Sequence, residues 1–212
     1  MHINTIPANK TKALNVKLMQ TLKNLFMRKL KLQVQISIDG YMAGPDEDMD
    51  WLEWNWDDEL KYYVSEITDP VDCILLGRKL AQGFIDTWAI RAEDPDTTDD
   101  FARKMNDTAK IVFTKTIFKS EWKNTLLEPG DIVEKVTNLK NTDGNDMIVY
   151  GGGTFVRTLI EACLIDEFHL FVNPTALGSG IPVFVNLQTM KLLNSRPFDC
   201  GIVVLCYELT GT

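Results

Sequence analysis

Three consecutive glycines between a strand pattern and a helix pattern constrain the folding of this chain more than any other feature. Residues 146–149 (DMIV) form an apolar run typical of a buried strand, and residues 156–163 then place apolar side chains at helical spacing. Gly151, Gly152 and Gly153 lie between the two patterns. A strand that passes through glycines directly into a helix leaves backbone N–H groups uncovered at the positive end of the helix dipole. This corner suits a phosphate or pyrophosphate, although glycines also form tight turns that bind nothing.

From residue 29 onward, strand patterns and helix patterns alternate along the chain. Strands are expected at residues 30–38, 72–76, 110–114, 147–150, 167–172, 190–195 and 202–209. Helices are expected at residues 57–67, from 79 onward, at 101–107 and at 154–162, whereas residues 132–139 fit either structure. This alternation predicts an α/β fold with a mostly parallel sheet, and the last two strands predict an antiparallel hairpin at the C-terminal edge.

Length and cysteine usage are those of an ordinary globular protein. The chain has 212 residues, and one domain with a single core is expected over residues 28–212. Residues 1–27 are rich in lysine and asparagine with leucines at helical spacing, so we expect an N-terminal extension there that is not a signal peptide. The four cysteines lie in apolar stretches without metal-ligand spacing, which predicts reduced core thiols in a cytoplasmic protein.

Charge and histidine content argue against several classes of function. The net charge of −8 argues against a nucleic-acid partner and against an anionic membrane surface. No apolar run approaches the length that crosses a bilayer. Because His2 and His169 are the only histidines, neither a histidine-based metal site nor a histidine-driven triad is expected. A small-molecule ligand is the expected partner.

Two further motifs with phosphate-binding chemistry follow predicted strands. Gly77, Arg78 and Lys79 come at the end of a buried strand, where a helix N-terminus and two cations can hold a phosphate together. A solvated helix start with two surface cations is the alternative. Thr114 and Lys115 place a hydroxyl and a cation after the next strand, and a simple helix cap explains them equally well.

Two loops complete the candidate site at the strand ends, where open α/β sheets bind ligands. The first contains Asp39 in an Asp-Gly turn and then Asp50 and Trp51, and it could form a lid over a flat ring. A turn without function and a tryptophan used only for packing are the alternatives. The second loop, residues 177–182 (LGSGIP), could enclose a small substrate or close a tight turn.

Taken in chain order, these motifs resemble the dihydrofolate reductase-like superfamily. Within it, the chain is similar to the C-terminal reductase domain of the bifunctional riboflavin-biosynthesis deaminase/reductase, in its stand-alone bacterial form. The likeness covers about residues 28–210, and these 212 residues contain no Cys/His zinc motif of the deaminase half. The matching stretches are residues 37–44 (SIDGYMAG), 50–52 (DWL), 76–79 (LGRK), 112–115 (VFTK), 149–153 (VYGGG), 164–167 (LIDE) and 174–182 (PTALGSGIP).

The resemblance implies a twisted, mostly parallel sheet with flanking helices that binds NADPH. It implies hydride transfer to a C=N or C=O carbon of a small heterocyclic or sugar-derived substrate, as in a 5-amino-6-(5-phosphoribosylamino)uracil reductase. Related domains commonly pair, so a homodimer is expected, with the C-terminal hairpin as an interface element. The residues that the resemblance assigns to the cofactor are Gly77, Arg78, Lys79, Thr114, Lys115, Gly151, Gly152, Gly153, Thr154 and Phe155. Those that it places beside the substrate are Trp51, Gly178, Ser179 and Gly180, with Asp39 and Asp50 as candidate proton donors through water.

Two departures from the family pattern keep other functions open. Leu80 stands where related proteins often have a threonine that helps to hold phosphate. Residues 45–56 are acidic and tryptophan-rich where the riboflavin-pathway domain carries basic residues, and an acidic loop binds a phosphorylated sugar poorly. The alternatives are a nucleotide-binding sensor or scaffold without turnover, and a pteridine or dihydrofolate-type reductase in which Trp51 forms a stacking wall.

Overall fold

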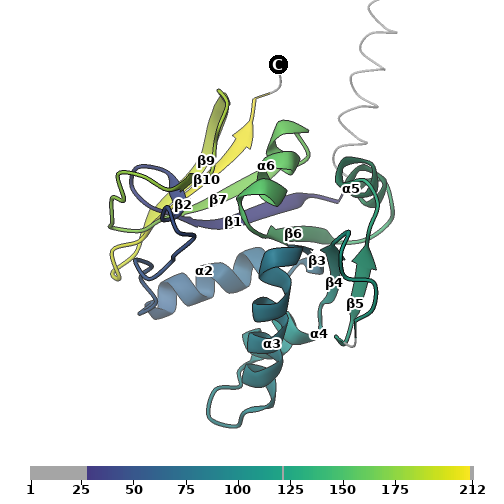
Figure 1. Cartoon of the computed structure of the whole chain (residues 1–212). Coiled ribbons are helices and arrows are strands. Elements are labelled where there is room, and N and C mark those ends of the chain that lie inside the picture. Colours follow the sequence, from purple (N-terminus) through teal and green to yellow (C-terminus); the bar gives the residue numbers. More distant parts are fainter. Residues whose placement is uncertain (1–27, 121, 211–212) are drawn as a thin grey trace, which may run out of the picture.

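The computed structural model describes residues 28–120 and 122–210 (Figure 1). The expected N-terminal extension lies outside these residues, and its boundary stays a prediction. The sheet contains β1 (Leu30–Ile36), β3 (Val71–Gly77), β4 (Ala109–Phe113), β5 (Thr125–Glu128), β6 (Asp146–Tyr150), β7 (Glu167–Val172), β9 (Met190–Pro197) and β10 (Val203–Leu209). The helices are α2 (Asp58–Thr68), α3 (Arg78–Glu93), α4 (Asp100–Asp107), α5 (Ile132–Lys140) and α6 (Gly153–Glu161).

The sheet is mostly parallel, as predicted. Its order is β5-β4-β3-β6-β1-β7-β10-β9, and the neighbours from β5 to β7 all run parallel. β10 pairs antiparallel with both β7 and β9, which confirms the C-terminal hairpin. A separate two-stranded ribbon joins β2 (Tyr41–Ala43) to β8 (Ile181–Pro182).

Helices cover both faces of the sheet (Figure 1). On one face, α6 packs on the central strands through residues such as Leu159, which is fully buried in the same cluster as Leu32 and Val149. On the other face, α2 packs over β7 and β10, and α3 and α4 pack over β3, β4 and β6. Fully burying an aliphatic side chain contributes about 1.5–3 kcal/mol, so these alternating apolar residues hold the layers together.

The helices begin in two different ways. The side chains of Asp57, Asp99 and Asp131 accept backbone N–H groups in the first turns of α2, α4 and α5, respectively. In contrast, α3 and α6 begin at Gly77 and Gly152, which offer no side chain to the first turn. A helix N-terminus has backbone donors without intrahelical partners, and the aspartates satisfy some of them.

The structure corrects several details of the sequence analysis. It adds β2, β5 and β8, which are too short to show a pattern, and it shows that residues 132–139 belong to a helix, α5. The expectation of four core thiols is wrong for two of them. Cys73 and Cys206 are buried, whereas Cys200 is half-buried and Cys163 is exposed, because Cys163 lies in a turn with positive φ after α6. None of the described helices has the length and apolar character needed to cross a membrane.

Candidate active site

The two glycine-led helices begin side by side at the carboxyl edge of the sheet. They follow β3 and β6, which are neighbours, and they leave toward opposite faces. A Cβ atom built on Gly151 would lie 3.4 Å from the backbone nitrogen of Gly77, which shows how closely the two corners approach. Neighbouring strands whose helices diverge in this way form the crevice in which open α/β sheets bind ligands. The two candidate phosphate motifs therefore belong to one site.

The glycines of the two corners have different roles. Gly77 and Gly151 make room for Phe155, because an added Cβ would lie 3.1 and 2.8 Å from its side-chain atoms. Gly153 makes room for β8, since its Cβ would lie 2.8 Å from Ile181 Cγ2. Gly152 is exposed and has open space where a Cβ would stand. Of the three consecutive glycines, Gly152 is thus the one that leaves space for a ligand beside the backbone.

The first turn of α6 separates exposed residues from core residues. Thr154 is exposed next to Gly152, whereas Phe155 is only 8% exposed and its ring packs 5.2 Å from that of Phe113. Phe155 therefore offers a ligand neither its side chain, which belongs to the core, nor a free N–H, because its N–H donates to the carbonyl of Gly152 at 3.1 Å. The uncapped N–H groups at this end of α6 suit a pyrophosphate, as the sequence predicts.

Cations surround the start of α3. Arg78 and Lys115 are exposed, and within the described residues neither forms an ion pair, whereas Lys79 Nζ lies 2.5 Å from Glu47 Oε1. Thr114 follows β4 directly beside Gly77, and its hydroxyl accepts the N–H groups of residues 116 and 117 at 3.2 and 3.1 Å. The hydroxyl of Thr114 therefore closes a turn, and Arg78 and Lys115 are the cations that remain free for an anion.

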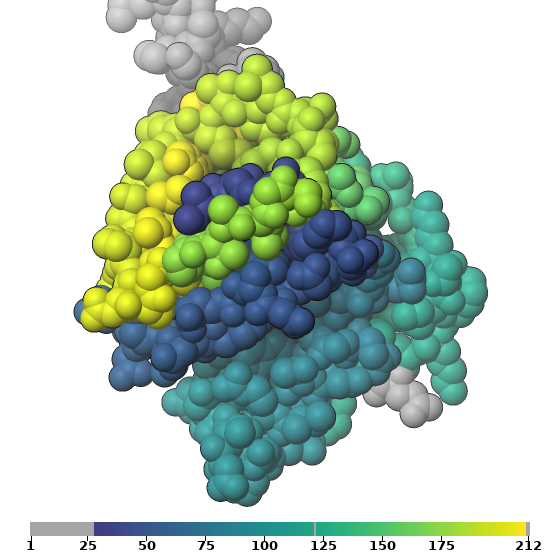
Figure 2. Space-filling view, turned by 60° about the vertical axis from the view of Figure 1, so that its left-hand side comes forward, coloured from purple at the N-terminus to yellow at the C-terminus, as the bar shows by residue number. Residues whose placement is uncertain are grey.

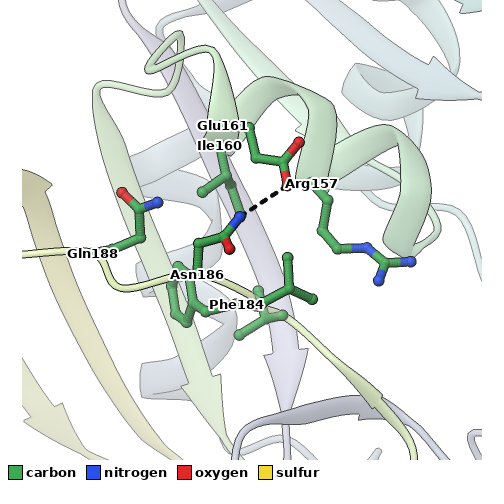
Figure 3. Close-up of a pocket in the computed structure, with 8 residues that line it drawn as sticks. Arg157, Ile160, Glu161, Phe184, Asn186 and Gln188 are labelled. Atoms are coloured by element: carbon green, nitrogen blue, oxygen red, sulfur yellow. Dashed lines mark hydrogen bonds between the residues drawn. The ribbon is translucent and has the colours of Figure 1, made fainter.

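Sequence reasoning missed Arg157. Its Nε donates to the carbonyl of Gly153 at 2.9 Å, so this half-buried cation folds back along α6 toward the glycine corner. The available signal was its position four residues after Gly153, one helical turn from the N-terminus. Figure 3 shows Arg157 beside a pocket between α6 and residues 183–188. In that pocket Asn186 donates to Glu161 at 3.2 Å.

Asp39 fastens the two predicted loops to each other. Its carboxylate accepts the hydroxyl of Ser37 at 2.6 Å and the backbone N–H groups of Leu177 and Gly178 at 3.1 and 2.6 Å. These hydrogen bonds, that of Ser37 first, lower the pKa of Asp39 to about 2. A carboxylate with this pKa stays ionised at neutral pH and is a poor proton donor. This geometry favours a structural role for Asp39 and leaves Asp50, which is exposed, as the candidate donor.

The second loop packs closely against the first. The φ of Gly180 is +151°, and a Cβ there would lie 2.2 Å from the carbonyl oxygen of Ala43, so only glycine fits. Gly178, with φ +74°, and Ser179 are both exposed nearby. Figure 2 shows the lime-coloured residues near 175–180 lying against the purple and dark-blue segments that follow β1. The structure thus brings these loops together at the end of the central strand.

The tryptophans of the first loop divide between two places. Trp51 is half-buried, and its enclosed indole N–H has no hydrogen-bond partner in the part of the chain that the structure describes. Trp56 stacks on Phe171 of β7 with ring centroids 6.1 Å apart, and Trp54 stacks on Trp56 at the same distance. The last two belong to the region around α2 and β7, whereas the glycine corners follow β3 and β6.

Comparison with known proteins identifies relatives over nearly the whole described chain. The family profile of the RibD C-terminal domain matches residues 28–204. The uncharacterized protein YyaP of Bacillus subtilis (strain 168) is 32% identical over 195 residues, which cover 89% of this chain and 98% of that protein.

Solved structures share the fold at lower identity. The Thermotoga maritima diaminohydroxyphosphoribosylaminopyrimidine deaminase/5-amino-6-(5-phosphoribosylamino)uracil reductase aligns with a TM-score of 0.61 at 16% identity, over 87% of this chain and 57% of that one. A dihydrofolate reductase from Enterococcus faecalis, complexed with NADP(H), aligns with a TM-score of 0.56 at 13% identity, over 88% of this chain and 99% of that one. These likenesses confirm the dihydrofolate reductase-like fold. With the profile spanning residues 28–204, the chain belongs to the RibD C-terminal domain family.

Proposed function

We propose that this protein is a cytoplasmic, NADPH-dependent reductase of the riboflavin-biosynthesis reductase-like type. The observation that carries the proposal is the pair of adjacent helix N-termini without side-chain caps at Gly77 and Gly152, with the exposed Arg78 as the first residue of α3 and the exposed Lys115 two residues after β4, the strand beside Gly77. Two positive helix ends and two cations are suited to a ligand with several phosphates. When bound, the nicotinamide would supply a hydride to a C=N or C=O carbon of a small heterocyclic or sugar-derived substrate.

The protein's own residues would bind, orient and enclose the reactants. In this proposal the backbone N–H groups after Gly152 hold the pyrophosphate, and Arg78 and Lys115 hold the 2′-phosphate that distinguishes NADPH from NADH. The loop around Ser179 excludes water from the reacting carbons, while Asp39 keeps that loop closed onto the end of β1. Asp50 delivers the proton through water.

A cofactor titration tests the proposal. Energy transfer from the tryptophans to reduced nicotinamide should show saturable NADPH binding that is tighter than NADH binding. Arg78→Ala should weaken NADPH and leave NADH nearly unchanged, because the lost contact is with the 2′-phosphate. Equal affinities of the wild-type protein for both cofactors would remove the phosphate assignment, and no binding at millimolar cofactor would remove the reductase proposal.

A sensor or scaffold without turnover is the second candidate. The geometry of Asp39 favours it, because this candidate proton donor already accepts three hydrogen bonds within the protein. NADPH binding without oxidation across a panel of flavin precursors and pteridines would support this candidate. Oxidation with any member of the panel would exclude it.

We also propose a homodimer that uses the C-terminal hairpin. β9 is an edge strand of the sheet, and it exposes Leu192 and Leu193 at 49% and 43%. An exposed edge strand with apolar side chains is suited to pairing with a second copy. Sedimentation velocity should show a species of twice 24.1 kDa, and a single monomeric species would contradict the proposal.

A further inference from the structure

The middle of the sheet carries polar side chains that the proposed cofactor contacts do not use. Alternate residues of β1 share one face, and Lys31 identifies that face, because its Nζ donates to the carbonyl of Ile67 in α2 at 3.1 Å. Gln33 and Gln35 therefore also point toward the side of α2 and α3. Both are half-buried, although β1 lies in the interior of the eight-stranded sheet.

Burial around the two glutamines shows that this part of the sheet is not fully covered. Phe171 beneath α2 and Leu76 beneath α3 are both inaccessible to solvent. Between them, the two glutamines, Tyr150 at the end of β6 and Phe84 on α3 all stay half-buried, with the two aromatic rings 5.1 Å apart. An interior strand keeps partly exposed side chains only where no helix lies over it, so an opening separates α2 from α3 above β1.

Asn173 fixes the orientation of the Gln35 carboxamide. The Asn173 side chain is completely buried, its Oδ1 accepts the N–H of Glu53 at 3.0 Å, and its Nδ2 donates to the carbonyl of Phe171 at 3.1 Å. These backbone partners distinguish the oxygen of the Asn173 carboxamide from its nitrogen. Its Nδ2 therefore donates to Gln35 Oε1, at 2.8 Å. The NH2 group of Gln35 is therefore the end that does not meet Asn173, and it has no hydrogen-bond partner among the described residues.

Tyr150 is the partner of Gln33. Its hydroxyl donates to Gln33 Oε1 at 2.8 Å. The NH2 group of Gln33 likewise has no partner in the described part of the chain. Tyr150 directly precedes Gly151, so this pair of amide donors continues from the glycine corner along the face of the sheet. Two residues of a strand span about 6.7 Å, which is the width of a small ring system.

The surroundings of the opening favour an uncharged ligand. Residues 37–57 and 173–190, which form the loops at the end of β1, contain no lysine or arginine. The N-terminus of α2 is capped by Asp57 and carries Asp58 and Glu59 in its first turn. The cations that reach these elements, Lys79 and Arg196, are already paired with Glu47 and Glu59, so a phosphate on the substrate would meet mainly carboxylates there, and such a contact is unfavourable.

We propose that Gln33 and Gln35 form a donor edge that binds the hydrogen-bond acceptors of the second substrate, an uncharged heterocycle with carbonyl or ring-nitrogen acceptors and no phosphate. This inference rests on the proposed reductase function and selects the heterocyclic over the sugar-phosphate class. The glutamines bind the ring and position it beside the glycine corner, and no chemical step is assigned to them.

The variants Gln33→Glu and Gln35→Glu test the donor edge. Each keeps the oxygen that Tyr150 or Asn173 requires and replaces the NH2 donor by a second acceptor. The probe is lumazine, a bicyclic ring with two carbonyl groups, titrated calorimetrically with and without NADP+. Loss of one hydrogen bond weakens binding about fivefold, and replacement by a repelling carboxylate should weaken lumazine more than tenfold. The same variants should bind 2,4-diaminopyrimidine, a donor-rich ring, more tightly than the wild-type protein does.

The control is Gln82→Glu, which adds the same charge at an exposed position of α3 and should leave lumazine affinity unchanged. Thermal unfolding shows that each variant is folded. Unchanged lumazine affinity in both variants, or no lumazine binding by the wild-type protein, would overturn the donor edge. Ribose 5-phosphate binding to the NADP+-loaded protein as tight as that of lumazine would overturn the phosphate-free class. If NADPH does not bind but lumazine binds in a glutamine-dependent manner, the reductase proposal fails and the donor edge stands.

Discussion

The helices of this protein differ most at their first residues. α2, α4 and α5 begin with an aspartate whose carboxylate accepts a backbone N–H, at 2.6 to 2.9 Å. α3 and α6 begin with glycine and have no acidic residue in the first turn, whereas the first turns of the other three all contain one. A capping carboxylate satisfies one of the free donors and opposes the positive helix end, so the capped helices have less need of a bound anion.

The glycine-led helices α3 and α6 lack both a side-chain cap and an acidic residue in the first turn, and their N-termini lie next to each other. Aspartates cap three other helices of this chain, whereas no side chain caps the helices at Gly77 and Gly152, and the proposed anion site would account for this difference. An anion bound at these corners would take the place of the aspartate. The comparison therefore predicts that a carboxylate introduced at a glycine-led helix competes with the cofactor, while removal of a carboxylate elsewhere affects stability alone.

The largest expected effect comes from Gly152→Asp. There is open space for a side chain at this position, and aspartate is a good N-cap, so the free energy of unfolding should stay within about 0.5 kcal/mol of the wild-type value. The new carboxylate would occupy the backbone donors and repel phosphate, and NADPH affinity should fall about 100-fold. Titration of cofactor together with thermal unfolding checks both parts. Gly152→Ala, which adds a Cβ without charge, should change the affinity less than threefold, and an equal loss in both variants would contradict the anion site.

Arg78→Ala should produce the next largest effect. A charge-assisted hydrogen bond contributes about 1.5–3 kcal/mol, so NADPH affinity should fall at least about tenfold while NADH affinity hardly changes. The matched control is Lys79→Ala, because Lys79 already pairs with Glu47 at 2.5 Å and should contribute less to the cofactor. The measurement is the ratio of the two dissociation constants in each variant. A larger loss for Lys79→Ala than for Arg78→Ala would reassign the phosphate contact.

The sequence predicts the framework of the site better than the individual roles within it. Glycine runs and strand periodicity are local signals, so both corners and the order of the main elements follow from them. The different roles of Gly151, Gly152 and Gly153 do not follow from these local signals. They depend on contacts with Phe155 and Ile181, whose packing is set by the tertiary fold.

Long-range contacts also determine the roles that the sequence analysis missed. The hydrogen bonds of Asp39 to Leu177 and Gly178 cross 138 and 139 positions of the chain, so an Asp-Gly turn alone cannot reveal the clamp. Gln35 meets Asn173 across 138 positions, and neither residue carries a motif. Two glutamines at alternate positions of a central strand are nevertheless a readable signal, because a polar pair is unusual where both faces of a sheet are covered.

Removal of the cap from a capped helix should lower stability and leave cofactor affinity unchanged. This is the opposite of the result expected for Gly152→Asp in α6. Asp131 Oδ1 accepts the N–H of Glu134 at 2.9 Å at the start of α5, and Asp131→Ala should lower the free energy of unfolding by about 1 kcal/mol. NADPH affinity should not change, since α5 follows the edge strand β5 and its cap is already within the protein. Urea unfolding and cofactor titration of the same variant separate the two quantities. Weaker cofactor binding in Asp131→Ala would show that the two kinds of helix start are not functionally distinct.

The smallest expected effect is the pH dependence of a cap. The N–H of Leu60, followed by that of Cys200, lowers the pKa of Asp57 below its ordinary value of 3.8. A carboxyl group whose pKa is lower in the folded state stabilises the protein above its unfolded pKa, and this contribution is lost as the pH falls through the folded pKa. Asp57→Asn keeps a capping oxygen for the N–H of Leu60 that does not titrate and loses the acceptor of the Cys200 N–H, so its stability should be lower but should fall less steeply with acid than that of the wild-type protein. Urea unfolding from pH 5 downward would compare the two slopes. Identical slopes would mean that the hydrogen bonds of Asp57 do not depend on its charge, and that an uncharged oxygen could complete a helix of this protein as well as an anion does.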